Sequence, residues 1–347
     1  MRIRFEAPIL SDPKWYPILD VILMLVEDGR HSISPDSAQE VLNSEWLKQR
    51  PGDARDLIRL ASVSRSYDDS ADLSSVTLDG GVRRGGLVDR PNNASRVHPL
   101  DAILFLSTPF QVIVESELYD GGFLLWMAKA VGFGRFVDAY RKSKFIFRHA
   151  GGKDSIKHSA EILSGGVWPR RDKSYERAMQ LWACVVLDSD ARYRGDDRNA
   201  NLRSAVEPHV SFVHQLRKRS IESYLPQAAL QRFSSDIVHR RKVAALGRMT
   251  DEQRMHYNMK RGFRFGSVEL PDKASYLASD FVTQEEKALF QAVPDPDWMN
   301  LATGFGRSLS QIYVHEQYRP NLNDATFSDP RDREEMIKLI KAIYERI

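Results

Sequence analysis

Acidic residues stand at the ends of two apolar runs in the middle of the chain. Residues 110–114 form a largely apolar run that leads directly into Glu115. Residues 183–187 form a second run, which leads into Asp188 and Asp190. A continuous Val, Ile and Leu run is typical of a strand buried on both faces, so both runs predict central strands of a parallel sheet. Ligands of open α/β sheets lie beyond the carboxyl ends of the strands, which places these carboxylates at one edge.

Several carboxylates at one sheet edge repel one another unless cations lie between them. Hard divalent cations with oxygen ligands, chiefly Mg²⁺ or Mn²⁺, suit such a cluster. Two such ions about 4 Å apart can activate a water, neutralise a phosphate and stabilise the leaving oxygen of a phosphodiester. We therefore predict a two-metal site with the candidate ligands Glu115, Asp120, Asp188, Asp190 and Glu222.

Each acidic motif also has a plainer interpretation. As strand residues two positions apart, Asp188 and Asp190 would face the same side and share one cation. The same two residues could instead cap a following helix. Glu222 follows Ser220, which can cap a helix that begins there. The combination of the motifs favours a metal site over separate caps.

The elements that must position these residues alternate between strand and helix over residues 99–230. The predicted strands are residues 110–114, 144–147, 183–187 and 210–216, and the predicted helices are residues 123–131, 155–163 and 174–181. This alternation indicates an α/β fold with a mostly parallel, Rossmann-like sheet flanked by helices.

The flanking regions are expected to be mainly helical. Residues 1–98 predict a helical N-terminal region with a possible first strand at residues 3–7. Residues 66–98 are rich in Ser, Asp, Gly and Arg, which predicts a flexible loop with a possible strand at residues 76–78. Residues 231–347 predict a helical C-terminal region.

The charge of the chain is nearly balanced. Its 347 residues include 50 Lys and Arg against 47 Asp and Glu, a net charge of +3, so a strongly basic surface must be local. Arginine suits phosphate contact, although a solvated helix face is the plainer interpretation of any single basic cluster. The candidates for nucleic-acid binding closest in sequence to the acids are Arg192, Arg194, Arg217, Lys218 and Arg219.

The sequence carries signals of compartment as well. The one cysteine, Cys184, lies in a predicted strand, so we expect it in the core with no disulfide within the chain. The first residues lack the apolar stretch of a secretory signal. The apolar run at residues 18–26 is too short to span a bilayer and contains Asp20. These features predict a cytoplasmic protein that does not associate with membranes.

Taken together, the acidic stretches resemble a TOPRIM domain, the metal-binding fold shared by topoisomerases, bacterial primases and a set of nucleases. The family's pattern is a strand ending in Glu and then a strand ending in Asp-x-Asp, here Glu115 and residues 188–190. Residues 219–225, Arg-Ser-Ile-Glu-Ser-Tyr-Leu, are similar to a stretch of the overcoming-lysogenization-defect (OLD) nucleases. Residues 149–153 fit the Gly-rich turn after their second strand. The resemblance covers about residues 105–230.

The chain departs from this pattern near the first acid. Ser116 stands where the family usually has Gly, and Tyr119 stands where its second acid usually lies. Either Asp120 or Glu117 therefore takes the role of that second acid. The resemblance also implies a catalytic lysine beyond the sheet, for which Lys260 is the candidate.

The resemblance implies a divalent-metal-dependent nuclease acting on DNA or RNA, in anti-phage defence or a toxin-type system. Its catalytic residues would be Glu115, Asp188, Asp190 and Lys260. OLD proteins usually carry an ATPase, and this sequence has no GxxxxGK[ST] motif, so we expect an ATPase or other regulatory partner in trans, or self-association. Two alternatives stay open. One is a non-catalytic nucleic-acid-binding or assembly subunit with a degenerate TOPRIM core, and the other is a primase-like or strand-passing enzyme.

Overall fold

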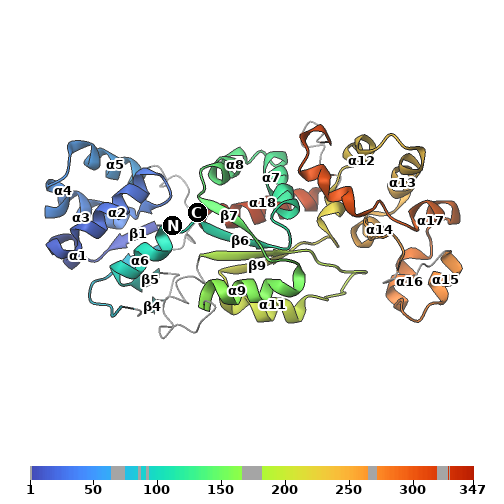
Figure 1. Cartoon of the computed structure of the whole chain (residues 1–347), viewed down its shortest axis with the longest axis horizontal. Coiled ribbons are helices and arrows are strands. Elements are labelled where there is room, and N and C mark those ends of the chain that lie inside the picture. The colour runs from blue at the N-terminus through green and yellow to red at the C-terminus, as the bar shows by residue number, and fades with distance from the viewer. Residues whose placement is uncertain are drawn as a thin grey trace.

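The computed structural model describes residues 2–63, 75–84, 87–90, 94–165, 182–264, 272–318, 327 and 329–347 of the chain. Figure 1 shows an elongated molecule in which three parts follow one another along the long axis. A small sheet with its helices lies at one end, a second sheet lies in the middle, and a group of helices forms the other end.

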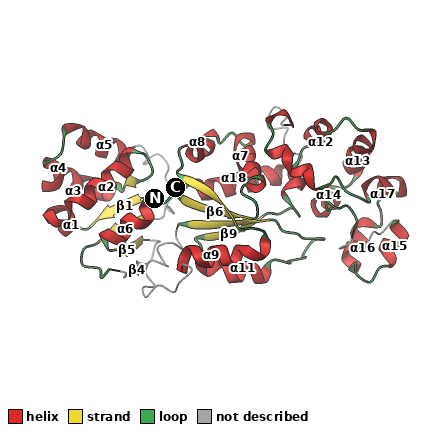
Figure 2. Ribbon diagram, in the orientation of Figure 1, coloured by secondary structure: helices red, strands yellow, loops and turns green. Residues whose placement is uncertain are grey.

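The N-terminal part is built on a five-stranded sheet with the strand order β2-β1-β3-β5-β4 (Figure 2). Its strands are β1 (Arg2–Phe5), β2 (Ser32–Ile33), β3 (Ser75–Leu78), β4 (Leu87–Arg90) and β5 (Ala94–Val97). β4 runs antiparallel to β5, and the other neighbours run parallel.

This sheet contains the strands predicted at residues 3–7 and 76–78, as β1 and β3, and it corrects the prediction of a loop over the rest of residues 66–98. Three strands fall within that range, although residues 66–74, 85–86 and 91–93 lie outside the described part. β4 and β5 escaped prediction because they have only four residues each, too few to show a period.

Helices pack on this sheet through apolar positions. They are α1 (Ala7–Ser11), η1 (Pro13–Trp15), α2 (Tyr16–Glu27), α3 (Pro35–Asn43), α4 (Glu45–Lys48), α5 (Gly52–Val63) and α6 (Pro99–Leu106). In β1, Ile3 and Phe5 are buried and alternate with half-exposed arginines, the period of a strand with one covered face. Ile22 of α2 lies in the same core.

The central part is a four-stranded parallel sheet with the order β7-β6-β8-β9. Its strands are β6 (Phe110–Val114), β7 (Phe145–His149), β8 (Ala183–Leu187) and β9 (Phe212–Gln215). Each neighbouring pair runs parallel. The predicted α/β class, with a parallel sheet flanked by helices, is therefore confirmed. The predicted strand bounds are right to within two residues, and the predicted helix at residues 174–181 lies outside the described residues.

Helices cover both faces of the central sheet (Figure 1). One face carries α7 (Tyr119–Ala130), α8 (Gly134–Arg141) and α18 (Pro330–Tyr344), and the other carries α9 (Ile156–Gly165) and α11 (Ala200–Val206). Val112 and Val114 of β6 belong to the large core on the α7 side. Ile113, which points the other way, packs in a smaller cluster with Ile156 of α9. Burial on both faces is the reason that β6 and β8 are continuous apolar runs.

The C-terminal part is helical in its described residues, as predicted. It contains α12 (Gln227–Phe233), α13 (Ile237–Arg248), α14 (Asp251–His256), α15 (Lys273–Ala278), α16 (Gln284–Phe290), α17 (Asp295–Leu301), η5 (Arg307–Tyr313) and η6 (Glu316–Tyr318). The last helix, α18, leaves this group and returns to pack on α7. The helix layer of the central sheet thus includes residues far beyond position 230. None of the helices in the described residues combines the length and apolar character needed to cross a bilayer.

Candidate active site

The strand order of the central sheet places a topological switch point between β6 and β8. From β6 the chain crosses to β7 on one side and returns to β8 on the other. At such a switch point the connections leave on opposite faces of the sheet, and ligands of open α/β folds bind beyond the carboxyl ends of those strands. Glu115 directly follows β6 and Asp188 directly follows β8, so both side chains stand at this point.

Two further acids reach the same place from other elements. Asp120 lies in the first turn of α7, and Glu222 lies in the short turn η4 (Ile221–Tyr224) beyond β9. The charges of Glu115, Asp120 and Glu222 all act on Asp188. We call Glu115, Asp120, Asp188 and Glu222 the carboxylate cluster. Glu222 is 0% exposed, which is rare for a glutamate and requires a compensating partner.

Burial and mutual repulsion raise the pKa values of three acids in this cluster, Glu115, Asp120 and Asp188. Burial, followed by the charges of Asp120 and Asp190, raises the pKa of Glu115 to about 7. Burial raises the pKa of Asp120 to about 6, with Glu222 adding to the shift and a hydrogen bond from the Ser116 N–H opposing it. Burial and the other cluster acids raise the pKa of Asp188 well above its usual value. The acids therefore hold protons more tightly than they would in water, as carboxylates crowded in a cleft do.

Lys260 supplies a positive charge inside the cluster. Its Nζ lies 3.0 Å from Glu222 Oε1, and the hydroxyl of Ser310 donates a hydrogen bond to the same oxygen. Burial lowers the pKa of Lys260, but the carboxylates of Glu222, Asp188 and Asp120 outweigh it, so the pKa lies above its usual value. The structure thus brings together Lys260 and the predicted acids, although about 40 residues separate Lys260 from Glu222 along the chain.

The cluster contains the carboxylate oxygens that a hard cation prefers, but these oxygens do not yet surround one common position. Among the described residues, no three His, Cys, Asp or Glu side chains already surround a common cation position. The reason is that carboxylate oxygens face other partners: Glu222 faces Lys260, and Asp120 Oδ2 accepts a hydrogen bond of 2.8 Å from the Ser116 N–H. Asp188 Oδ1 and Glu222 Oε2 are buried and accept no hydrogen bond within the described part of the chain. Such oxygens are of the type that Mg²⁺ or Mn²⁺ takes as ligands, and the metal site stays a prediction.

Asp190 departs from its predicted place. β8 ends at Leu187, so Asp188 and Asp190 are not strand residues that face the same side, and this expectation was wrong. Asp190 has a φ of +54°, which turns the chain aside, and its N–H donates to Arg219 O at 2.9 Å. Its carboxylate lies 2.5 Å from Lys153 Nζ. Asp190 therefore borders the cluster, where its charge acts on Glu115.

The structure distinguishes the two candidates for the second acid of the first motif. Asp120 points into the cluster, where it interacts with Glu222 and Asp188. Glu117 is exposed and lines an open cavity beside α7. Asp120 is therefore the acid that accompanies Glu115.

The basic residues predicted to bind nucleic acid lie in three different settings. Arg217 pairs with Asp329 and Asp332, and Lys218 Nζ lies 2.7 Å from Asp332 Oδ2, so both charges are neutralised within the chain. Arg194 is exposed in the loop after β8. Arg192 and Arg219 line a cavity against helices of the C-terminal part. Nucleic-acid binding stays a prediction, and it now applies better to Arg192, Arg194 and Arg219 than to Arg217 and Lys218.

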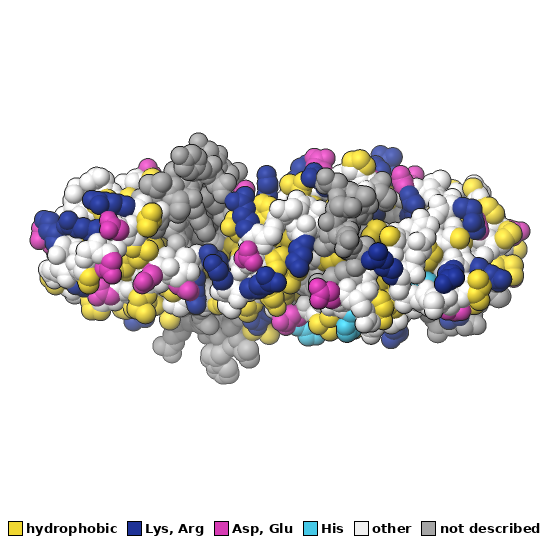
Figure 3. All heavy atoms as spheres, turned by 90° about the horizontal axis from the view of Figure 1, so that it is seen from above, with side chains coloured by type: hydrophobic (Ala, Val, Ile, Leu, Met, Phe, Trp, Pro, Cys, Tyr) yellow, Lys and Arg dark blue, Asp and Glu magenta, His cyan; other side chains and the backbone are white. Residues whose placement is uncertain are grey.

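The surface charges do not by themselves mark a binding face. Figure 3 shows lysine and arginine side chains spread along the whole length of one side of the molecule, with acidic side chains between them. This distribution agrees with the net charge of only +3. A polyanion would therefore be held by local groups of arginines near the site.

Sequence reasoning missed two residues of the site. Lys153 was seen as part of a Gly-rich turn, but its pairing with Asp190 was not predicted. Gly151 and Gly152, with φ values of +84° and +107°, form the turn that presents it. Ser310 lies in η5, 88 residues after Glu222, and no local pattern points to it.

Gly262 fixes the loop that carries Lys260. Its φ is +70°, and a Cβ there would lie 2.3 Å from Leu301 O and 2.4 Å from Ala302 O. We expect Gly262→Ala to destabilise the protein by roughly 2–5 kcal/mol, because a left-handed alanine costs about 1–2 kcal/mol and the overlap adds to it. Urea unfolding measures this. Gly132→Ala is the matched control, since Gly132 has a φ of +77° with no atom within 4 Å; an equal loss in both variants would contradict the close packing at Gly262.

Comparison of the chain with models of protein families, with curated proteins and with solved structures found no match. The arguments for function therefore rest on the geometry of this chain.

Proposed function

We propose that the chain is a divalent-metal-dependent nuclease of TOPRIM type, similar to the OLD nucleases, that hydrolyses phosphodiesters of DNA or RNA. The observation that carries the proposal is the convergence of Glu115, Asp120, Asp188 and Glu222 at the switch point of the parallel sheet, with Lys260 among them. Acids that raise one another's pKa in a cleft are costly to the fold, which favours a functional role over a structural one.

Each residue of the site has a role that its surroundings support. The carboxylates of the cluster would hold Mg²⁺ or Mn²⁺, which supplies Lewis acidity and a more acidic bound water. Burial and the neighbouring acids raise the pKa of Glu115 to about 7 in the metal-free protein, so Glu115 would give up its proton when it binds a cation as a ligand. Lys260 keeps its proton, because neighbouring acids raise its pKa, and can neutralise charge on the phosphate or the leaving oxygen.

The alternative is a non-catalytic nucleic-acid-binding or assembly subunit. The ion pair between Lys260 and the fully buried Glu222 favours it, because this pair already satisfies one of the cluster acids. Under either proposal, an ATPase or other regulatory protein would act in trans, and anti-phage defence or a toxin-type system is the proposed setting.

A pair of neighbouring glutamates tests the nuclease proposal. Plasmid, linear DNA and tRNA are incubated with the purified protein in Mg²⁺, Mn²⁺ or EDTA. We expect metal-dependent cleavage that falls by at least about 10²-fold in Glu115→Gln, because the amide removes a charged ligand of the metal. Glu117→Gln, which changes an exposed acid two residues away, should cleave like the wild type. Cleavage that persists in EDTA, or that survives Glu115→Gln unchanged, would exclude this mechanism, and no cleavage of any substrate would favour the binding subunit.

A further inference from the structure

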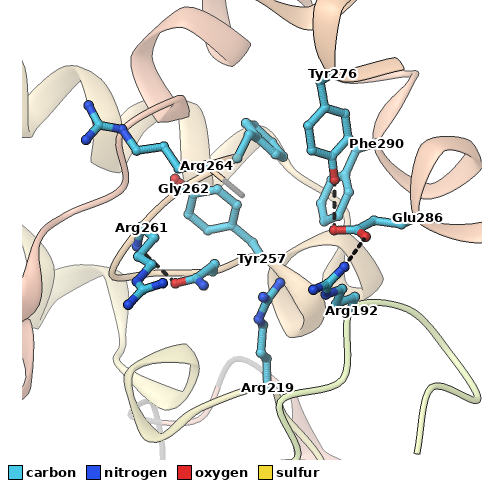
Figure 4. Close-up of a pocket in the computed structure, with 11 residues that line it drawn as sticks. Arg192, Arg219, Tyr257, Arg261, Gly262, Arg264, Tyr276, Glu286 and Phe290 are labelled. Atoms are coloured by element: carbon cyan, nitrogen blue, oxygen red, sulfur yellow. Dashed lines mark hydrogen bonds and ion pairs between the residues drawn. The ribbon is translucent and has the colours of Figure 1, made fainter. Parts of the chain in front are cut away.

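A cavity lined by arginines lies where the loop after β8, the segment before η4 and the segment after α14 meet (Figure 4). Arg192 comes from the loop after β8, Arg219 from the segment before η4, and Arg261 and Arg264 from the segment after α14. We call these four residues and the space between them the arginine pocket. The cavity measures about 100 Å³. A water needs roughly 10–15 Å³ on this measure, so the space is large enough for a phosphate group.

The positive charge of the pocket is only partly neutralised within the chain. Glu286 lies 3.6 Å from Arg192, and its other oxygen accepts a hydrogen bond of 2.8 Å from the Tyr276 hydroxyl. Arg219 Nη1 donates to the carbonyl of His256 at 2.9 Å, and Arg219 forms no ion pair with any described residue. In Figure 4 the Arg219 guanidinium points up between the loop of Arg261 and the side chain of Arg192. Arg219 and Arg261 form no ion pair with the described residues, so these two side chains leave the pocket positively charged.

The base of the pocket is rigid and apolar. Tyr257 is buried, and its hydroxyl donates to Leu301 O at 2.5 Å. Phe263 stacks on Trp298 with ring centroids 3.6 Å apart. These rings are held by the core, so they close the end of the cavity and do not serve as a platform for a base. An apolar base also strengthens the attraction between the arginines and an anion, because little water screens it.

We infer that the arginine pocket binds a terminal phosphate group, as found at the end of a nucleic acid strand or on a free mononucleotide. A terminal phosphate carries a charge of about −1.5 to −2 at pH 7 and three acceptor oxygens. It can therefore accept hydrogen bonds from more than one guanidinium group at the same time. A phosphodiester carries only one charge and has fewer free oxygens, so it would satisfy fewer of the arginines than a terminal phosphate does.

The pocket and the carboxylate cluster share their supporting segments. Arg261 directly follows Lys260, which contacts Glu222. The carbonyl of Arg219 holds the N–H of Asp190, two residues after Asp188. The end of a strand held in the pocket would therefore lie near the cluster. This last step rests on the proposed nuclease function, whereas the binding of phosphate does not.

Direct binding tests the inference without cleavage. The full chain in EDTA is titrated with a short single-stranded DNA that carries a phosphate at the 5′ end, at the 3′ end or at neither end. We expect one phosphorylated end to raise the affinity at least about tenfold, the effect of one or two charge-assisted hydrogen bonds. Inorganic phosphate and AMP are used as competitors. If they bind while neither phosphorylated end raises the affinity, the terminal phosphate comes from a free nucleotide.

Substitutions assign the effect to the pocket. Arg219→Gln and Arg261→Gln should remove the gain, and Arg261 is exposed, so its variant is expected to fold even if the Arg219 variant does not. Arg83→Gln, an exposed arginine of the N-terminal part, is the control of equal charge. The inference is overturned if all three DNAs bind equally well and neither phosphate nor AMP binds. It is also overturned if Arg83→Gln loses the gain in affinity as fully as the pocket variants do. Phosphate binding without metal-dependent cleavage would support the arginine pocket and contradict the nuclease proposal. Metal-dependent cleavage without any effect of a terminal phosphate would support the nuclease proposal and contradict the phosphate site.

Discussion

Asp188→Asn is expected to abolish metal-dependent cleavage, with a loss of at least about 10³-fold, the scale on which central electrostatic groups act. Asp188 stands at the switch point of the sheet, and all the other cluster acids act on it. Its buried Oδ1 accepts no hydrogen bond from the described residues, so this oxygen is available to a cation. Asparagine keeps the shape and removes the negative charge. Initial rates with Mn²⁺ and a plasmid substrate measure the loss, and a rate within about tenfold of the wild type would remove Asp188 from the mechanism.

The same variant should gain stability in the absence of metal. The folded-state pKa of Asp188 lies above that of the unfolded chain, so between the two values the folded state binds more protons and stability falls as pH rises. For Glu115 this window runs from about 4.5 to about 7, and for Asp120 from about 3.8 to about 6. We expect Asp188→Asn to have a higher Tm than the wild type in EDTA at pH 7, with the difference shrinking toward pH 4. Loss of cleavage together with a lower Tm at pH 7 would indicate a damaged fold and not a missing ligand.

Asp332→Ala is expected to cause the largest loss of stability, about 3–5 kcal/mol, because it leaves the buried Lys218 without its ion-pair partner and the half-buried Arg217 with Asp329 alone. Asp332 is 2% exposed and forms ion pairs with both Arg217 and Lys218. In the variant, Asp329 still pairs with Arg217. These contacts attach the start of α18 to the segment between β9 and Glu222. Urea denaturation followed by circular dichroism measures the free energy of unfolding.

Glu334→Ala is the matched control on the same helix. Glu334 pairs with Lys338 at 2.6 Å, but both side chains are exposed, and such surface pairs contribute little. We expect its stability to be nearly that of the wild type. If the two variants unfold at the same urea concentration, the network around Asp332 does not hold α18 in place.

The sequence by itself determined the central sheet and the position of its acids. The apolar runs before Glu115 and Asp188 could be identified because a strand buried on both faces has no polar alternation to obscure it. Their order along the chain and the rule for ligands at sheet ends predicted that both acids would share one edge. Lys260 was proposed from the resemblance alone, and its contact with Glu222 depends on the fold.

The tertiary structure decided which charges remain available. Arg217 and Lys218 resemble phosphate ligands in sequence, but α18 returns over more than 100 residues to neutralise them, and no local pattern encodes such a return. Asp190 was drawn away by a left-handed turn and by Lys153, because backbone torsions at a strand end are set by the packing around it. The N-terminal sheet formed from strands of two to four residues, whose pairing comes from distant partners and not from their own propensity. The arginine pocket likewise exists only where three separate segments meet.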